Sequence, residues 1–271
     1  MVNDTPQAGS TQLVPEVTAP SGVKSSMRTL EVLELLSNAG QRQSITAISR
    51  ELGIPKSSLH GILRTMLSRG WLETDASGSL YGLGMRALLS GAAYVETDDI
   101  VALAAGALDS IALETSETTH LGRLDGPDIV YLAKRESTHA LRLFSAVGRR
   151  LPAHATSLGK VLLAQLDDDE VDRRLRWPLE RLTDRTIVDP AALHAELAHI
   201  RETGFAYEHG ENAPGIQCIA VGLEPTRGSL NAISCSVPDT RMTPTQREVI
   251  LQSLRKAAQT IDAMSHHLRR V

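Results

Sequence analysis

The chain has little cysteine, no long apolar run and no leader-like start. Its 271 residues include two cysteines, Cys218 and Cys235, which are too few for a disulfide framework or a structural zinc site. No apolar stretch approaches the roughly 20 residues that span a bilayer. The first residues lack the basic and apolar regions of a signal peptide. We therefore expect a soluble, cytoplasmic protein with no membrane partner.

Sequence patterns of catalysis are also missing. Neither a nucleophile-elbow nor a phosphate-loop motif occurs, and the histidines have no spacing typical of metal ligands. We therefore expect no metal and no cofactor. One catalytic alternative stays open, in which Cys218, His154 and Glu211 form the nucleophile, base and orienting group of a hydrolase or transferase.

Charge is distributed unevenly along the chain. The formal net charge is −4, yet residues 23–70 hold seven bases and three acids, which is +4 and leaves −8 for the rest. A basic module on an acidic body is typical of a protein in which one domain meets the phosphates of nucleic acid. The length is sufficient for two ordinary domains with cores of their own.

Two short helices joined by a tight turn are predicted over residues 44–70. In the first, Ile45, Ile48 and Leu52 recur at helical spacing behind Ser44, a candidate N-cap. Gly53 ends this helix, because glycine readily takes the left-handed conformation of a helix C-terminus.

The second helix begins at Pro55 and presents two different faces. One face is apolar, and the other is made of small, hydroxylic or basic residues, namely Lys56, Ser57, Ser58, His60, Gly61, Arg64 and Thr65. A helix that enters the DNA major groove presents such groups from its N-terminal turns. A helical hairpin with a solvated outer face fits the same pattern, and the pattern alone does not separate the two.

The neighbouring segments favour the DNA-binding interpretation. Helical periodicity over 23–38 supplies a third helix, and short strands at 71–74 and 80–83 flank a turn, so that residues 23–84 predict a winged helix-turn-helix domain. Residues 1–22 are rich in Pro, Ser, Thr, Gly and Gln and predict a disordered tail. Residues 85–97 predict a linker helix.

The second domain, residues 98–271, mixes helical and period-two patterns. We expect an antiparallel or mixed sheet flanked by helices, so the chain as a whole belongs to the α+β class. Its strands are predicted at 118–124, 129–132, 141–144, 205–209, 216–223 and 230–237, and its helices at 98–115, 168–175, 190–203 and 243–268. The last helix starts with a capping box, Thr243 to Gln246.

Several segments together resemble the IclR-type bacterial transcriptional regulators. These segments are residues 26–33, 51–60, 81–84, 147–160 and 211–220, and the match covers nearly the whole chain from about residue 23. The resemblance implies a winged-helix reader joined to a GAF-like α/β effector-binding domain, as a homodimer or homotetramer on a palindromic operator. Two departures are Gly61, where the family commonly has arginine, and Gly210, where many members have an acidic residue.

Candidate DNA contacts lie on the second helix and around it. Because Arg and Lys bind guanine or phosphate and hydroxyls bind either, the set is Lys56, Ser57, Ser58, His60 and Arg64, with Arg28, Arg42 and Ser44 nearby. Arg28 and Arg42 fit backbone contacts and surface charges equally well.

Candidate effector contacts lie in the second domain. The segment Thr156 to Lys160 begins a helix, whose N-terminal amides favour a carboxylate, and nearby hydroxyls complete an anion pocket. The resemblance implies that this loop, Cys218 and the serines of the last strand line the pocket. The full set is Leu121, Leu143, Ala155, Thr156, Ser157, Glu211, Cys218, Ser234 and Ser236. Ser157 fits a plain helix cap as well, and the two leucines fit plain core.

These observations predict a repressor of a catabolic operon that responds to a ligand. It binds double-stranded operator DNA as a homo-oligomer, and a small organic acid, aromatic or a keto acid, enters the second domain. Differential affinity of the acid for one domain arrangement then shifts DNA binding.

Overall fold

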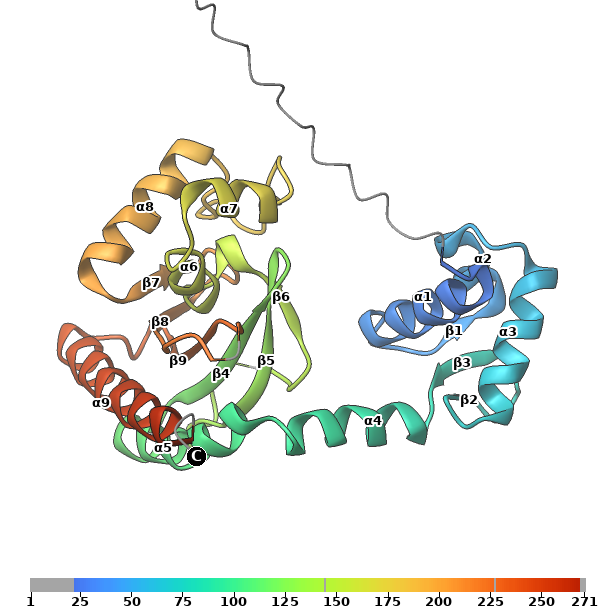
Figure 1. The fold of residues 1–271 in the computed structure, drawn as a ribbon, viewed down its shortest axis with the longest axis horizontal. Helices are drawn as coiled ribbons and strands as arrows, with labels where there is room; N and C mark the ends of the chain where they lie inside the picture. The colour runs from blue at the N-terminus through green and yellow to red at the C-terminus, as the bar shows by residue number, and fades with distance from the viewer. Residues whose placement is uncertain (1–21, 144, 227, 269–271) are drawn as a thin grey trace, which may run out of the picture. The chain divides into compact units, whose positions relative to one another are not determined.

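The computed structural model describes residues 22–143, 145–226 and 228–268, in two compact units that meet between Ala93 and Tyr94 (Figure 1). Apart from Gly22, the predicted tail lies outside these residues. Among the described residues, no helix is both long and apolar enough to cross a membrane.

The first unit is a three-helix winged domain. Its elements are α1 (Lys24–Asn38), β1 (Gln43–Ser44), α2 (Ile45–Leu52), α3 (Lys56–Ser68), β2 (Leu72–Thr74), β3 (Leu80–Leu83) and the first part of α4 (Met85–Glu96). The three strands pair in the order β1-β3-β2. The core holds Val32, Ile48, Leu59 and Leu63, all fully buried, from the three helices.

Local capping residues fix the turn between α2 and α3. The Ser44 hydroxyl accepts a hydrogen bond from the Ala47 amide at 3.2 Å, as predicted for an N-cap, and Gly53 ends α2 at a φ of 62°. Pro55 is the N-cap of α3 rather than its first helical residue. Met27 and Leu30 at the start of α1 are exposed, so only the later part of this helix, with Val32 and Leu36, packs in the core.

The second unit is a six-stranded antiparallel sheet with helices on both faces. The strands are β4 (Thr118–Asp125), β5 (Asp128–Arg135), β6 (Arg150–Pro152), β7 (Ala206–His209), β8 (Ile216–Gly222) and β9 (Asn231–Pro238). They pair in the order β6-β5-β4-β9-β8-β7. The helices are α5 (Asp99–Thr115), η1 (Ala153–Ala155), α6 (Ser157–Leu163), α7 (Asp168–Arg174), α8 (Pro190–Thr203) and α9 (Pro244–Leu268).

Each face of this sheet has its own hydrophobic cluster. Helices α5 and α9 lie together on one face, over Leu121, Ile219 and Ile233. Helices α6 and α8 cover the other face, over Ile129 and Ala220 (Figure 1). Because successive residues of a strand point to opposite faces, the strands β4, β5, β8 and β9 contribute to both clusters. The candidate pocket lies on the α6 face.

Two local predictions in this unit are wrong. Residues 141–143 form no strand, because the free edge of β5 pairs instead with β6, where Ile129 lies opposite Leu151. The predicted capping box of α9 is half formed. The Gln246 amide donates to the Thr243 hydroxyl at 3.1 Å, but the Gln246 side chain donates to the Thr115 carbonyl at 3.2 Å and so joins α9 to α5.

Candidate DNA-reading helix and effector cavity

Helix α3 separates its two faces as the sequence predicts. It buries Leu59, Leu63 and Met66 against α1 and α2. Its exposed face carries Lys56, Ser57, Ser58, His60 and Arg64. Proline at the N-cap has no side-chain acceptor for the first amides of the helix, and the Ser58 and Leu59 amides donate to the Pro55 carbonyl at 3.0 Å. The positive end of the helix dipole lies beside the lysine and the serines, an arrangement that suits phosphate.

Two of the remaining DNA candidates, Arg42 and Ser44, have partners inside the first unit. Arg42 pairs with Glu73 of β2 at 2.6 Å, which ties the wing to the segment before α2. The Ser44 hydroxyl is occupied as the N-cap of α2. Arg28 is half-buried on α1. Arg42 and Ser44 therefore have structural roles that the sequence did not separate from DNA contact.

The wing turn is held by a carboxylate. Asp75 accepts hydrogen bonds from the Ser77 hydroxyl at 2.6 Å and from the amides of Ser79 and Leu80 at 3.0 and 2.9 Å. These donors lower the pKa of Asp75 to about 2. Because the turn is fixed before any contact is made, the wing is preorganised.

A polar cavity lies between α6 and the strands β5, β8 and β9. It is lined by Tyr131, Leu143, Thr156, Ser157, Leu158, Glu208, Asn212, Ala213, Ile216, Cys218, Ser234 and Ser236. Six of the nine predicted effector residues are among these: Leu143, Thr156, Ser157, Cys218, Ser234 and Ser236. The cavity has a volume of about 20 Å³, which is room for one water molecule.

Three predicted effector residues lie elsewhere. Leu121 packs on the opposite face of the sheet, in the cluster with Ile233, because strand periodicity places a residue on a strand without saying which face is the pocket. Ala155 is fully buried in η1, outside the cavity lining. Glu211 forms an ion pair with Lys160 at 2.7 Å.

The buried Lys160 organises the loop beside the cavity. Its ammonium donates to Glu211, to Glu196 at 3.0 Å and to the Tyr207 carbonyl at 3.0 Å, and its side chain is 1% exposed. Burial raises the pKa of Glu211 despite the neighbouring lysine. Glu211 is thus a structural anchor of residues 210–215.

The start of α6 depends on a threonine and a glycine. The Thr156 hydroxyl caps the helix by accepting from the Gly159 amide at 3.0 Å, which leaves Ser157 as the residue that faces the cavity. A Cβ on Gly159 would lie 2.1 Å from the Ala153 carbonyl oxygen. Glycine is therefore required for the close approach of α6 to η1.

Glu208 is the acidic cavity residue that the sequence reasoning missed. It is 2% exposed, and its Oε1 accepts from the amides of Glu211 and Asn212. Burial raises its pKa to about 7. The sequence did contain a signal for Glu208. Side chains two residues apart on a strand point to the same face, so Glu208 lies on the same covered face as the buried Ala206.

The cavity wall also contains a thiol and an aromatic pair. The Cys218 thiol donates to the Ser236 hydroxyl at 3.2 Å, and burial raises its pKa well above the usual value, so sulfur stays protonated. Tyr131 stacks on the fully buried His120 at 4.3 Å between ring centroids. Burial lowers the pKa of His120 to about 3, so this imidazole is neutral.

The catalytic alternative is not assembled. The Cys218 thiol donates a hydrogen bond to the Ser236 hydroxyl, whereas the His154 ring donates to the Glu180 carbonyl at 2.9 Å. Among the described residues, no group of three or more His, Cys, Asp or Glu side chains is arranged to hold a metal.

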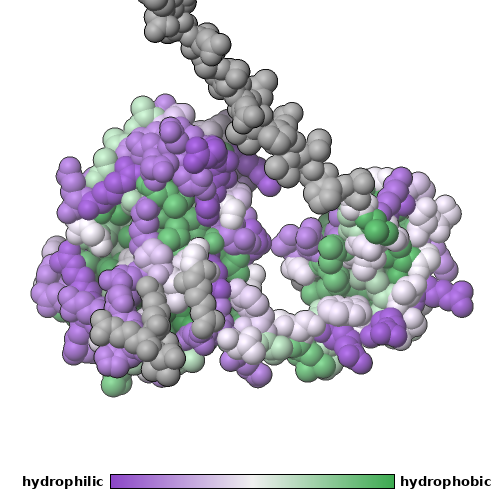
Figure 2. Space-filling view, in the orientation of Figure 1, coloured by the Kyte–Doolittle hydropathy of each residue, from purple (hydrophilic) through white to green (hydrophobic). Residues whose placement is uncertain are grey.

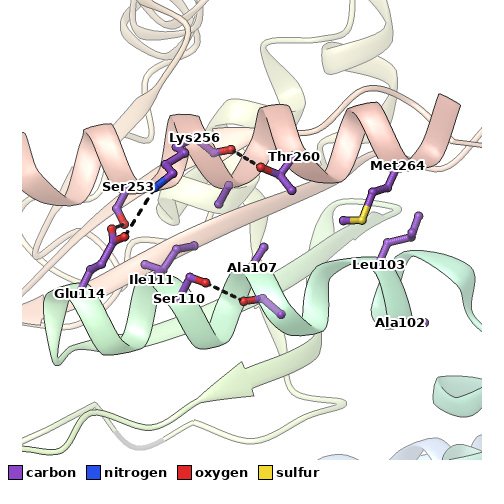
Figure 3. Close-up of a pocket in the computed structure, with 12 residues that line it drawn as sticks. Ala102, Leu103, Ala107, Ser110, Ile111, Glu114, Ser253, Lys256, Thr260 and Met264 are labelled. Carbon is purple, nitrogen blue, oxygen red and sulfur yellow. Dashed lines mark hydrogen bonds and ion pairs between the residues drawn. The ribbon is translucent and has the colours of Figure 1, made fainter. Parts of the chain in front are cut away.

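A larger hollow, about 430 Å³, lies between α5 and α9 (Figure 3). Its walls are mostly small and apolar, and its polar groups bind one another: Ser110 donates to the Gly106 carbonyl, Thr260 to the Lys256 carbonyl, and Lys256 lies 4.0 Å from Glu114. Size favours this groove as a ligand site. Convergent polar groups, which fix a ligand's orientation, favour the smaller cavity.

A winged helix with an exposed polar reading face, followed by a sheet with a small polar cavity, defines a DNA-binding regulator with a ligand-binding domain. Residues 25–76 match the IclR helix-turn-helix domain, and residues 92–263 match the bacterial transcriptional regulator IclR C-terminal domain. The chain belongs to the IclR family, as its motifs predicted. It is a ligand-responsive transcriptional regulator and not an enzyme.

Similar proteins extend over most of the chain. HTH-type transcriptional regulator XynR of Escherichia coli (strain K12) is 38% identical over 200 residues, which is 73% of this chain and 79% of that protein. An IclR transcriptional regulator from Alicyclobacillus acidocaldarius has a TM-score of 0.80 at 27% identity, covering 90% of this chain and 99% of that one. An IclR homolog from Microbacterium hydrocarbonoxydans, complexed with 4-hydroxybenzoate, has a TM-score of 0.72 at 27% identity, covering 89% and 98%.

Proposed function

We propose that this chain is a cytoplasmic repressor of a catabolic operon that binds operator DNA as a homo-oligomer and releases it in response to a small organic acid. The observation that carries the proposal is the pairing of an exposed, basic N-terminal turn on α3 with a small cavity lined by Ser157, Ser234 and Ser236. The 4-hydroxybenzoate complex of a structural relative supports an aromatic acid.

The DNA contact is proposed for the first two turns of α3. Lys56 stands at the start of the helix, where a side chain reaches phosphates and base edges together. Lys56→Ala is expected to weaken binding to all sequences and to lower the salt slope of the association constant by about one per bound protomer. The measurement is fluorescence anisotropy on a labelled duplex across a salt series.

Lys256→Ala is the matched control for this experiment. It removes the same charge from an exposed side chain of α9 in the second unit, so the slope should not change. An unchanged slope in Lys56→Ala would instead assign Lys56 to a solvated surface.

The effector site is proposed to be the cavity of Tyr131, Glu208, Cys218 and the serines. Hydroxyl and thiol donors are suited to carboxylate oxygens, and Leu143, Leu158 and Ile216 supply an apolar wall for a ring or short chain. Because the cavity has room for one water molecule, an acid enters only when the walls separate. Ligand binding therefore selects a different conformation, which is the requirement for a regulatory signal.

Calorimetric titration with benzoate, 4-hydroxybenzoate, pyruvate and glyoxylate tests this site. Ser236→Ala is expected to weaken binding of the active acid about tenfold or more, since one hydrogen bond to a charged group is lost. Ser253→Ala, a buried serine of the α5–α9 groove, is expected to leave the affinity unchanged. If Ser253→Ala weakens binding and Ser236→Ala does not, the acid occupies the groove.

The homo-oligomer is proposed to form through α4. None of the residues of α4 is buried, although Met85, Leu88 and Leu89 are apolar and lie on one side of the helix. Figure 2 shows the apolar surface along this helix. Such a stripe is covered by a partner more often than left in water. Sedimentation equilibrium of the chain is expected to give a dimer or a tetramer, and a monomer at micromolar concentration would contradict the proposal.

A further inference from the structure

One arginine of the sheet holds the junction between the linker helix and the effector-binding unit. The Arg123 guanidinium donates to the Tyr94 hydroxyl in the last turns of α4 at 2.7 Å, and to both carboxylate oxygens of Asp98 at 2.6 and 3.1 Å. Its Nε donates to the side chain of Asn231 at 2.9 Å. The four residues, which we call the Arg123 cluster, therefore join α4, the α4–α5 turn, β4 and β9.

Asp98 has a second role in this cluster. The oxygen that accepts from Arg123 at 3.1 Å also accepts from the Ile100 amide at 3.1 Å, so Asp98 is the N-cap of α5. The side chains of Arg123 and Asp98 are 17% and 14% exposed, which limits the screening of their attraction by water. The position of this ion pair thus determines where α5 begins and how α4 ends.

The same strand pair carries the Arg123 cluster and the cavity wall. Arg123 on β4 lies opposite Asn231 on β9, His120 lies opposite Ser234, and Thr118 lies opposite Ser236. Three residues along a strand span about 10 Å, so Ser234 is that close to Asn231. Because backbone hydrogen bonds join β4 and β9 over this register, we expect a displacement of β9 by an acid in the cavity to reach Asn231 and, through it, Arg123.

We propose that Arg123 is the positioning residue that transmits effector occupancy from the β4–β9 pair to the end of α4. This inference rests on the proposed effector response. When the cavity walls separate, β9 carries Asn231 with it and the Arg123 cluster rearranges. The direction in which α4 leaves the effector-binding unit then changes, and the affinity for DNA changes with it.

A second arginine provides a matched comparison. Arg135 on β5 also joins the sheet to α5, through Asp109 and, at 3.4 Å, the Ala105 carbonyl. Both of these partners lie in the interior of α5, whereas Arg123 reaches across the α4–α5 turn to Tyr94. If contacts between the sheet and α5 mattered only for stability, replacing either arginine would have the same effect on coupling between acid and DNA binding. The proposal requires that only the replacement of Arg123 removes this coupling.

The test measures coupling separately from binding. Coupling is the ratio of operator dissociation constants with and without a saturating acid, the probe being whichever of benzoate, 4-hydroxybenzoate, pyruvate or glyoxylate binds the natural chain. We expect a ratio of at least about fivefold in the natural chain, and a ratio within about twofold of one in Arg123→Met, with the acid affinity kept within about threefold. Arg135→Met is expected to keep the natural ratio.

A milder variant covers the case in which Arg123→Met does not fold. Tyr94 is 52% exposed, so Tyr94→Phe removes one hydrogen bond with little risk to folding, and it is expected to lower the ratio. Natural coupling in both Arg123→Met and Tyr94→Phe would overturn the proposal. An equal loss of the coupling ratio in Arg135→Met and Arg123→Met would also overturn the proposal. General loosening of the contact between the sheet and α5 would then be enough to explain the loss.

A ligand-free arm separates this inference from the proposed effector. Ala213→Leu fills the cavity from its half-buried loop and mimics occupancy. We expect it to change operator affinity in the natural background and to have no effect in the Arg123→Met background, a non-additivity that a double-mutant cycle measures. Additive effects, or no effect of Ala213→Leu on DNA binding, would contradict the role of Arg123. If none of the four acids binds while the Ala213→Leu results are as expected, only the proposed effector class is contradicted.

Discussion

Glu208→Gln is expected to make the stability of the effector-binding unit depend less on pH. In the folded chain, burial raises the pKa of Glu208 from 4.5 to about 7. The folded state therefore holds the proton more tightly than the unfolded state does. The resulting stability is fully present below pH 4.5 and is lost as the pH rises, until the folded carboxyl ionises near pH 7.

The gap between the two pKa values corresponds to about 3 kcal/mol, of which about 2.5 kcal/mol falls between pH 5 and pH 8. The glutamine of the Glu208→Gln variant would carry no charge at any of these pH values, and its amide oxygen is able to accept from the Glu211 and Asn212 amides as the carboxylate does. Histidines that titrate in the same range are present in both proteins, so their effects cancel in the difference.

Urea unfolding at several pH values checks this prediction. The two tryptophans are Trp71, in the first unit, and Trp177, in the second, so a Trp71→Phe background makes the fluorescence specific for the effector-binding unit. The natural residue is expected to lose about 2.5 kcal/mol more than glutamine between pH 5 and pH 8. Parallel pH profiles would refute the assignment of a neutral carboxyl to the cavity.

Two further predictions concern folding and assembly. Lys160→Met is expected to cost about 3–5 kcal/mol in urea unfolding, because Glu211 then keeps a buried charge without its partner. Adding Glu211→Gln should recover part of the loss, and no recovery would mean that the ion pair is not the cause. Leu88→Glu on the exposed stripe of α4 should dissociate the homo-oligomer in sedimentation experiments, whereas Ser90→Glu, on the other side of the helix, should not.

The winged domain was predictable from the sequence because its signals are local. The N-cap Ser44, the left-handed Gly53 and the apolar spacing of Leu59 and Leu63 act within a few residues, and the structure has each of them in its expected place. The exposed apolar start of α1 could not be anticipated in the same way. Periodicity gives a face, but it does not say which neighbour covers that face.

The sheet was harder to predict because pairing partners are distant in the sequence. The alternating apolar pattern over 141–144 suggested a strand, yet β6 pairs with the edge of β5. The three residues of β6 are too few to show a recognisable pattern. Leu121 was assigned to the pocket and packs on the other face. A single position cannot be assigned to a face until the layers on both sides are known.

The cavity was partly predictable for the same reasons. Ser157, Ser234 and Ser236 were expected in the pocket because of the resemblance to the IclR family, and all three line the cavity. Glu208 was missed in favour of Glu211, because both are acidic and only the tertiary position of Lys160 shows which one is neutralised by an ion pair. Ion pairing across 51 residues of chain leaves no local mark in the sequence.

The most direct test of the account is a mobility shift on the DNA immediately upstream of the gene for this chain, in the presence and absence of the four acids. The account predicts specific binding, stronger than to competitor DNA, that one acid weakens at least about fivefold. Specific binding that no acid alters would contradict the proposed effector. Binding no stronger than to competitor DNA would contradict the proposed operator and the role given to α3.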